Sequence, residues 1–194
     1  MISVAFSTLS CPDWSWTDLL RLGSEYGYDG VEVRLLRRET NLLSLSEFRP
    51  PQRSLRRREL QNAGFKVCGL ASSVRFDYAD AKQRIEQLAI GRAYVDLAAE
   101  LEAGFVRVFG DVLGGEQDSR KPEQTMGYIA EGLQSLGEYA SDHSLQIVIE
   151  THGDYSNTHI VRKTLDLVVC PSVGVLWDTH HPWKFQGESL QTSW

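Results

Sequence analysis

The stretch Ile147-Val148-Ile149-Glu150-Thr151-His152-Gly153-Asp154 joins a short β-branched run to an acidic residue and a histidine. β-Branched residues favour extended strands, and a glycine in the segment that follows is typical of a turn. A helical pattern precedes the stretch, because Met126, Ile129, Leu133, Leu136 and Ala140 are spaced by three and four residues and share one face. The stretch therefore predicts a buried strand that follows a covering helix.

Similar runs recur along the chain at intervals of about 30 to 40 residues, the length of a β-strand, helix and β-strand unit. They are Ile2 to Phe6, Val31 to Leu35, Lys66 to Leu70, Phe105 to Phe109, Leu145 to Glu150 and Val173 to Trp177. The helix before the second run begins at Ser15, with Asp18 placed to complete a capping box. Strict alternation of strands and helices predicts a parallel sheet covered by helices.

Glycine and proline mark the connections between these units. Gly64 and Gly104 each precede a strand, and we expect both to take the left-handed conformation that ends a helix. Pro50-Pro51 closes a long loop after the second run, and we expect it to interrupt any helix there. This loop is a candidate lid or pocket wall.

Two parallel architectures fit the alternation. A doubly wound sheet of the Rossmann type has a glycine-rich turn after its first strand, whereas Ser7-Thr8-Leu9-Ser10-Cys11-Pro12 contains no glycine. A (β/α)8 barrel of the TIM type is therefore preferred. A complete barrel needs about 250 residues, so we expect residues 1–194 to form a single, incomplete barrel domain of six units.

Composition limits the class of protein. The chain has 194 residues, 42% of them hydrophobic, a formal charge of -6 and three widely separated cysteines. This is typical of a soluble globular domain with reduced thiols, and no segment approaches the length of a membrane helix. We expect a cytoplasmic protein that binds neither nucleic acid, which requires a basic surface, nor a membrane.

Two carboxylates follow strands in successive units. Alternation along the fifth strand places Glu150 on the face opposite Ile147 and Ile149, and Asp178 follows the sixth strand in the same way. Both acids should then meet at the carboxyl ends of the strands, where TIM barrels hold their sites. Neighbouring carboxylates repel unless a cation neutralises them, which predicts a site for Mn²⁺, Mg²⁺, Co²⁺ or Zn²⁺.

Other side chains could complete this site. His181 follows Asp178 by three residues and could bind the metal or the substrate, and His152 is a second candidate for substrate binding. Trp183 could form the apolar wall of a sugar pocket. Arg34 belongs to an arginine-rich quarter of the chain, which is either solvated surface or a site for a substrate phosphate.

Arg107 lies inside the apolar run from Phe105 to Phe109. A charge in a buried strand requires an acidic partner. Glu32, which alternates with valines in the second run, is the candidate for a structural ion pair with Arg107.

The chain resembles the xylose isomerase-like superfamily of TIM barrels, in particular its sugar phosphate isomerases and epimerases. The residues that carry the resemblance are Tyr28 to Arg34, Val106 to Gly110, Ile149 to Asp154 and Trp177 to Trp183. The resemblance implies that Glu150 is a metal ligand and a catalytic acid or base, that Asp178 is a second ligand, and that His181 contacts metal or substrate.

The reaction that the resemblance implies belongs to carbohydrate metabolism. A metal ion would polarise a ketose carbonyl while a carboxylate moves a proton through an enediolate. Members of the superfamily complete the site with a histidine from the seventh strand and a glutamate from the eighth, and this sequence contains neither strand. We expect copies of the chain to associate and cover open sheet edges.

Two other functions stay open at this point. The chain could be a non-catalytic or inactive partial barrel that binds a sugar or a partner subunit. It could also be a zinc enzyme similar to apurinic-site endonucleases, which share the barrel and the D-x-x-H pattern. The acidic charge and the absence of histidines in Ser72-Ser73-Val74-Arg75 speak against the nuclease.

Overall fold

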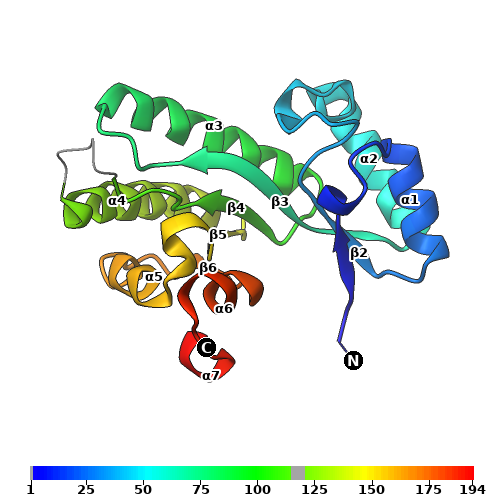
Figure 1. The fold of residues 1–194 in the computed structure, drawn as a ribbon. Coiled ribbons are helices and arrows are strands. Elements are labelled where there is room, and N and C mark those ends of the chain that lie inside the picture. The colour runs from blue at the N-terminus through cyan, green and yellow to red at the C-terminus, as the bar shows by residue number, and fades with distance from the viewer. Residues whose placement is uncertain (1, 115–120) are drawn as a thin grey trace. The chain divides into compact units, whose positions relative to one another are not determined.

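A computed structural model describes residues 2–114 and 121–194. Six strands alternate with helices along the chain, and they form one open sheet in the order β1-β2-β3-β4-β5-β6 (Figure 1). The strands are β1 (Ala5–Ser7), β2 (Gly30–Val33), β3 (Lys66–Arg75), β4 (Phe105–Phe109), β5 (Gln146–Glu150) and β6 (Val173–Leu176). The α-helices are α1 (Trp16–Glu25), α2 (Pro50–Ala63), α3 (Ala81–Glu100), α4 (Pro122–Ser141), α5 (Thr158–Leu165), α6 (His180–Gln186) and α7 (Leu190–Ser193).

Consecutive strands lie beside one another, which is the arrangement of a TIM barrel rather than of a Rossmann sheet. The pairs β1 with β2, β2 with β3 and β5 with β6 are parallel. The predicted fold class, a partial barrel of the TIM type, is therefore confirmed. Within the described residues, no helix has the length and apolar character needed to cross a bilayer.

The chain divides into two compact units, one of residues 1–73, 93–106 and 143–145 and one of residues 74–92, 107–142 and 146–194. In the first unit, α1 starts with the predicted capping box, in which Ser15 and Asp18 bond reciprocally. The helix then buries Trp16 and Leu19. The Trp16 ring meets Phe48 edge to face, so local capping and aromatic packing together fix this helix.

The second unit carries the ends of β4, β5 and β6. Helix α4 packs on β5 and buries Ile129, Leu133 and Leu136, as the periodicity predicted. Ile147 and Ile149 are fully buried. One face of β5 is thus packed in the core, and Glu150, the polar residue at the end of the strand, lies on the opposite face.

Two expected turns differ from the structure. Pro50 and Pro51 occupy the first positions of α2 rather than interrupting a helix. Proline is tolerated there because the N–H groups of the first turn make no hydrogen bond within the helix. Gly64 is left-handed as expected, but at the next junction Glu102 takes that conformation with φ 56°. Gly104 instead allows close packing, since a Cβ there would lie 3.0 Å from the Cys68 carbonyl oxygen.

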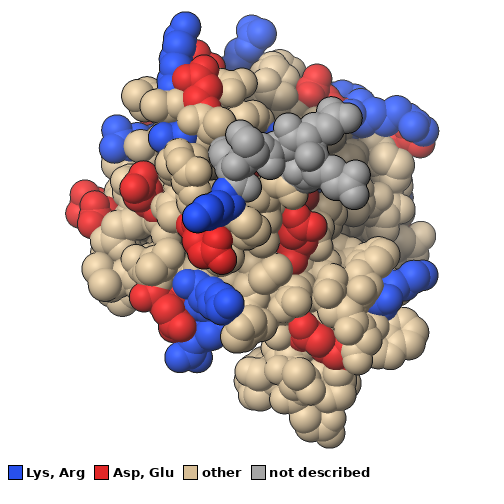
Figure 2. Space-filling view, turned by 60° about the vertical axis from the view of Figure 1, so that its left-hand side comes forward, with Lys and Arg blue, Asp and Glu red and all other residues tan. Residues whose placement is uncertain are grey.

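The arginine-rich segment is largely engaged in ion pairs of the first unit. The pairs are Arg37 with Glu47, Arg38 with Asp13, Arg53 with Glu100, Arg56 with Glu59 and Arg57 with Glu102. The hydrogen bond from Arg37 lowers the pKa of Glu47 to about 2. Figure 2 shows basic and acidic side chains interspersed on one face of the protein. The ion pairs of the arginine-rich segment favour the solvated reading of its arginines.

A substitution at Gly110, directly after β4, tests the packing of the second unit. A Cβ at this position would lie 2.5 Å from the ring of Tyr155, which is fully buried and bonded to Thr164 at 2.9 Å. We expect Gly110→Ala to lower the free energy of unfolding by about 1–3 kcal/mol, because the ring cannot move without disturbing the core. Urea denaturation followed by circular dichroism measures the change.

Gly127→Ala is the matched control. Gly127 lies in α4, and its Cβ would meet nothing within 4 Å. Alanine there should raise stability by about 0.5–1 kcal/mol through helix propensity. Equal losses in the two variants would contradict the packing argument.

Candidate metal centre

Glu150 is the last residue of β5 and lies on the strand face opposite the buried isoleucines. Its side chain is 14% exposed. In the parallel register of β5 and β6, Glu150 lies beside Leu176, so the next residues of both strands continue at the same edge. The expectation that Glu150 and Asp178 meet at this edge depends on that register.

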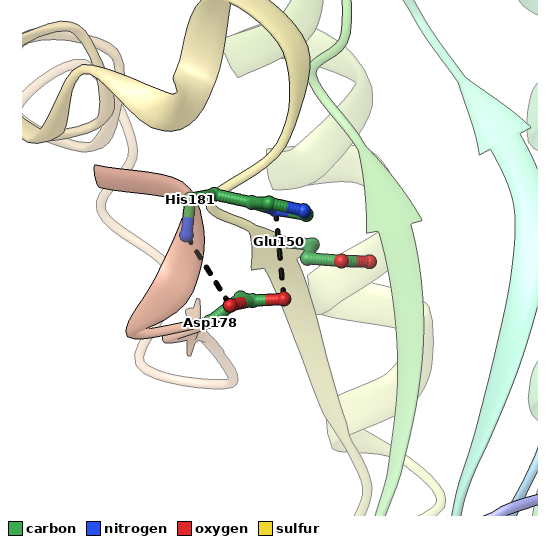
Figure 3. Close-up of side chains that lie close together, drawn as sticks. All are labelled: Glu150, Asp178 and His181. Atoms are coloured by element: carbon green, nitrogen blue, oxygen red, sulfur yellow. Dashed lines mark hydrogen bonds and ion pairs between the residues drawn. The ribbon is translucent and has the colours of Figure 1, made fainter. Parts of the chain in front are cut away.

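Asp178, His181 and Glu150 offer ligand atoms that all lie within 4.8 Å of one another. Figure 3 shows Glu150 on the end of β5, with Asp178 and His181 approaching it from the segment after β6 and from α6. Two carboxylates and one imidazole, all half-buried, form a donor set that suits a divalent cation. The residues therefore fit a metal, as the strand-end pattern predicted.

His181 is held by its Nδ1 atom. This nitrogen lies 2.8 Å from the carbonyl oxygen of Thr151, and 3.5 Å from Oδ2 of Asp178. Because a carbonyl oxygen only accepts, we assign the hydrogen to Nδ1. The lone pair of the neutral ring is then on Nε2, which is the atom left to bind a metal or a substrate.

Arg107 supplies a positive charge at the same place. Its Nε atom lies 2.9 Å from Oε2 of Glu150, and its guanidinium stacks 3.8 Å from the centre of the Phe109 ring. The strand pattern indicated that Arg107 needs an acidic partner but did not single out Glu150. Glu32, the candidate from the sequence, accepts a hydrogen bond from Ser7 at 2.8 Å.

His152 lies beside the three ligands. Its ring centre is 5.1 Å from that of His181, and its Nδ1 atom is 2.9 Å from Oδ1 of Asp111. Asp111 follows β4 with φ 59°, a conformation uncommon outside glycine. Asp111 was not predicted from the sequence, because neither its left-handed backbone nor its closeness to His152 forms a recognisable motif.

Asp111 also connects to the end of β3. Arg75 binds it at 3.2 Å and donates a hydrogen bond to Tyr78 at 3.1 Å. Burial acts to lower the pKa of Arg75, but the Tyr78 bond and the charges of Asp77 and Asp111 raise it overall. The strand ends from β3 to β6 thus carry one continuous polar network in the second unit.

Trp183 and Arg34 are not joined to the ligands by any contact that the structure describes. Trp183 lies on α6, is 62% exposed, and meets the His180 ring edge to face with 5.8 Å between centres. Arg34 belongs to the first unit, where it donates to the Ala71 carbonyl at 3.2 Å and to Ser73 at 3.0 Å. Their roles in substrate binding stay predictions.

Comparison with known proteins decides the family. The sequence profile of the xylose isomerase-like TIM barrel family matches residues 20–192. The chain belongs to this family. A search of curated proteins found no match to this sequence.

Solved structures share the fold at low identity. The apo 3-keto-D-glucoside 4-epimerase YcjR from E. coli has a TM-score of 0.81 at 12% identity, over 100% of this chain and 74% of that one. The IOLI protein, solved with a zinc atom, gives 0.78 at 18% identity over 98% and 67%. The probable 3-DHS dehydratase AsbF from Bacillus anthracis gives 0.74 at 16% identity over 94% and 65%. The chain therefore spans about two thirds to three quarters of these relatives.

The ion pair between Arg107 and Glu150 gives a test of the site's electrostatics. The two side chains are only 6% and 14% exposed. We expect Arg107→Met to lower the free energy of unfolding by about 3 kcal/mol, because it leaves the Glu150 carboxylate without this cation. Urea unfolding at pH 7 measures the loss.

An exposed ion pair is the control. Arg162 and Asp166 lie 2.8 Å apart on α5, with side chains 79% and 59% exposed. Arg162→Met should change stability by at most about 0.5 kcal/mol, because water screens this pair. Similar effects of the two substitutions would argue against a buried role for Arg107.

Proposed function

We propose that the chain is a divalent-metal-dependent isomerase or epimerase that acts in the cytoplasm on a small sugar, keto-sugar or sugar phosphate. The observation that carries this proposal is the convergence of Glu150, Asp178 and His181 within 4.8 Å at the ends of β5 and β6. Enzymes of this architecture hold their sites at these strand ends. The epimerase title of a related structure agrees with this class of reaction.

Glu150, Asp178 and His181 would hold the metal, which is Mn²⁺, Mg²⁺, Co²⁺ or Zn²⁺. Zinc occurs in a structure of the same fold. When bound, such an ion supplies a Lewis acid that polarises a carbonyl oxygen and an adjacent hydroxyl of the substrate.

The chain's own residues would then move the proton. Arg107 holds Oε2 of Glu150 and so orients the carboxylate, which would take a proton from the carbon beside the carbonyl and return it to the neighbouring carbon. His152 would bind a substrate hydroxyl through Nε2, because Asp111 occupies its Nδ1. Trp183 would cover an apolar sugar face.

Solvent exchange of a substrate proton tests this function. We expect the protein with Mn²⁺ to catalyse exchange of a ketose C–H proton with deuterium from D₂O, followed by proton NMR on a panel of ketoses. Glu150→Gln should lower the rate by at least about 100-fold, because the amide cannot accept the proton. Glu138→Gln, an exposed change on α4, should leave the rate unchanged.

The outcomes separate the possible functions. Full exchange activity in Glu150→Gln would reject Glu150 as the base. Metal and sugar binding without exchange would favour a non-catalytic sugar-binding barrel. Cleavage of DNA at abasic sites by the zinc-loaded protein, without ketose exchange, would favour the nuclease.

We also propose that copies of the chain associate through the β6 edge. In the described sheet β6 pairs with β5 alone. Exposed apolar residues gather on and after this strand: Val175, Trp183, Phe185, Leu190 and Trp194. An open strand edge with apolar neighbours is a surface that proteins usually cover.

Sedimentation velocity tests the association. We expect the protein to sediment as a dimer or larger species, and Val175→Lys to shift it toward monomer, because a charge on an edge strand opposes pairing. Ile85→Lys is the control, since Ile85 is equally apolar and 67% exposed but lies on α3. A monomer at high protein concentration would refute the proposal.

A further inference from the structure

Thr151 connects the three candidate ligands to one another. It follows Glu150 directly in the chain, and it is only 1% exposed. Its hydroxyl and its carbonyl bond to the other two ligand residues, Asp178 and His181. We infer that Thr151 is a positioning residue whose hydroxyl holds Asp178, and whose carbonyl holds His181, in place to bind the metal, an inference that rests on the proposed function.

The Thr151 hydroxyl makes two hydrogen bonds to the backbone of one residue. It accepts from the Asp178 N–H at 2.8 Å and donates to the Asp178 carbonyl at 3.1 Å. The last backbone hydrogen bond between the two segments is made two residues before Asp178, where the Thr151 N–H donates to the Leu176 carbonyl at 3.1 Å. The hydroxyl therefore extends the β5 to β6 connection beyond the last strand bond, to the residue that carries the second carboxylate.

The carbonyl of Thr151 acts on the third ligand. It accepts the Nδ1 hydrogen of His181 at 2.8 Å, which fixes the ring orientation and leaves the lone pair on Nε2. The His181 N–H also lies 3.4 Å from Oδ1 of Asp178. Movement of the Asp178 segment would therefore move His181 as well.

Only some residues can do this at position 151. A serine keeps the hydroxyl, whereas valine keeps the shape and the burial but can neither accept the Asp178 N–H nor donate to its carbonyl. At 1% exposure the side chain has little contact with solvent that could replace the lost bonds. The hydroxyl, rather than the size of the side chain, is thus the property to test.

Metal affinity distinguishes positioning from simple stability. We expect Thr151→Val to weaken Mn²⁺ binding, measured by calorimetry, by about 10- to 100-fold, as expected for a residue that orients metal ligands. Thr151→Ser should bind Mn²⁺ nearly as well as the unsubstituted protein. Thr164→Val is the matched control, because Thr164 is fully buried and bonds through its hydroxyl to Tyr155 but touches none of the ligands.

A second measurement needs no metal and begins with the unsubstituted protein. Hydrogen exchange of the Asp178 amide, followed by NMR in the metal-free protein, should be slow, because that N–H is bonded to the buried hydroxyl. In Thr151→Val, where it folds, the same amide should exchange faster, while Thr164→Val should leave it slow. A freely exchanging Asp178 amide in the unsubstituted protein would overturn the inference.

The outcomes separate this inference from the proposed function. Equal Mn²⁺ affinity in Thr151→Val and the unsubstituted protein would overturn the positioning role and leave the function standing. Equal losses in Thr151→Val and Thr164→Val would also overturn it, because a general loss of stability would then explain both. Absence of Mn²⁺ binding in the unsubstituted protein would refute the proposed function and, with it, this role of Thr151, even where the amide proves protected.

Discussion

The parallel register of β5 and β6 is the constraint on which the candidate centre depends. With Glu150 beside Leu176, both strands reach the same edge, and the chain after β6 has two residues in which to present Asp178. A shift by one residue would turn Glu150 toward the core that Ile147 and Ile149 occupy. The buried isoleucines therefore stabilise the register, and the register in turn places the carboxylate, so core packing and the site share one cause.

Electrostatics explains why the acids can remain close together. Two half-buried carboxylates repel, and Arg107 offsets part of this repulsion through Glu150. Asp178 is instead bonded by backbone N–H groups of α6, at 2.8 Å from His180 and 3.4 Å from His181. The two acids are thus stabilised by separate donors.

The sequence predicted the alternation, the order of the strands and the identity of the acids, because these follow from a period of two residues and from the repeat of strand and helix. It did not predict Asp111, whose left-handed backbone appears only in the folded turn. The ion pair between Arg107 and Glu150 was not predicted either, because it depends on how β4 and β5 lie beside each other in the folded sheet. Gly104 and Glu102 show the same limit, since Glu102 takes the left-handed conformation while Gly104 packs closely against the carbonyl oxygen of Cys68.

The side chains of the candidate site differ in the contacts that position them, and these contacts determine which residues can be substituted without disturbing the others. Glu150, Asp178 and His181 are positioned by strand pairing and by backbone bonds that pass through Thr151. His152 is oriented by one side chain, Asp111, and Trp183 is largely exposed. Substitutions at such exposed or side-chain-held positions can change the surroundings of Glu150, Asp178 and His181 without moving these three residues. A barrel of this construction can therefore keep its strand-end residues in place while the side chains around them vary.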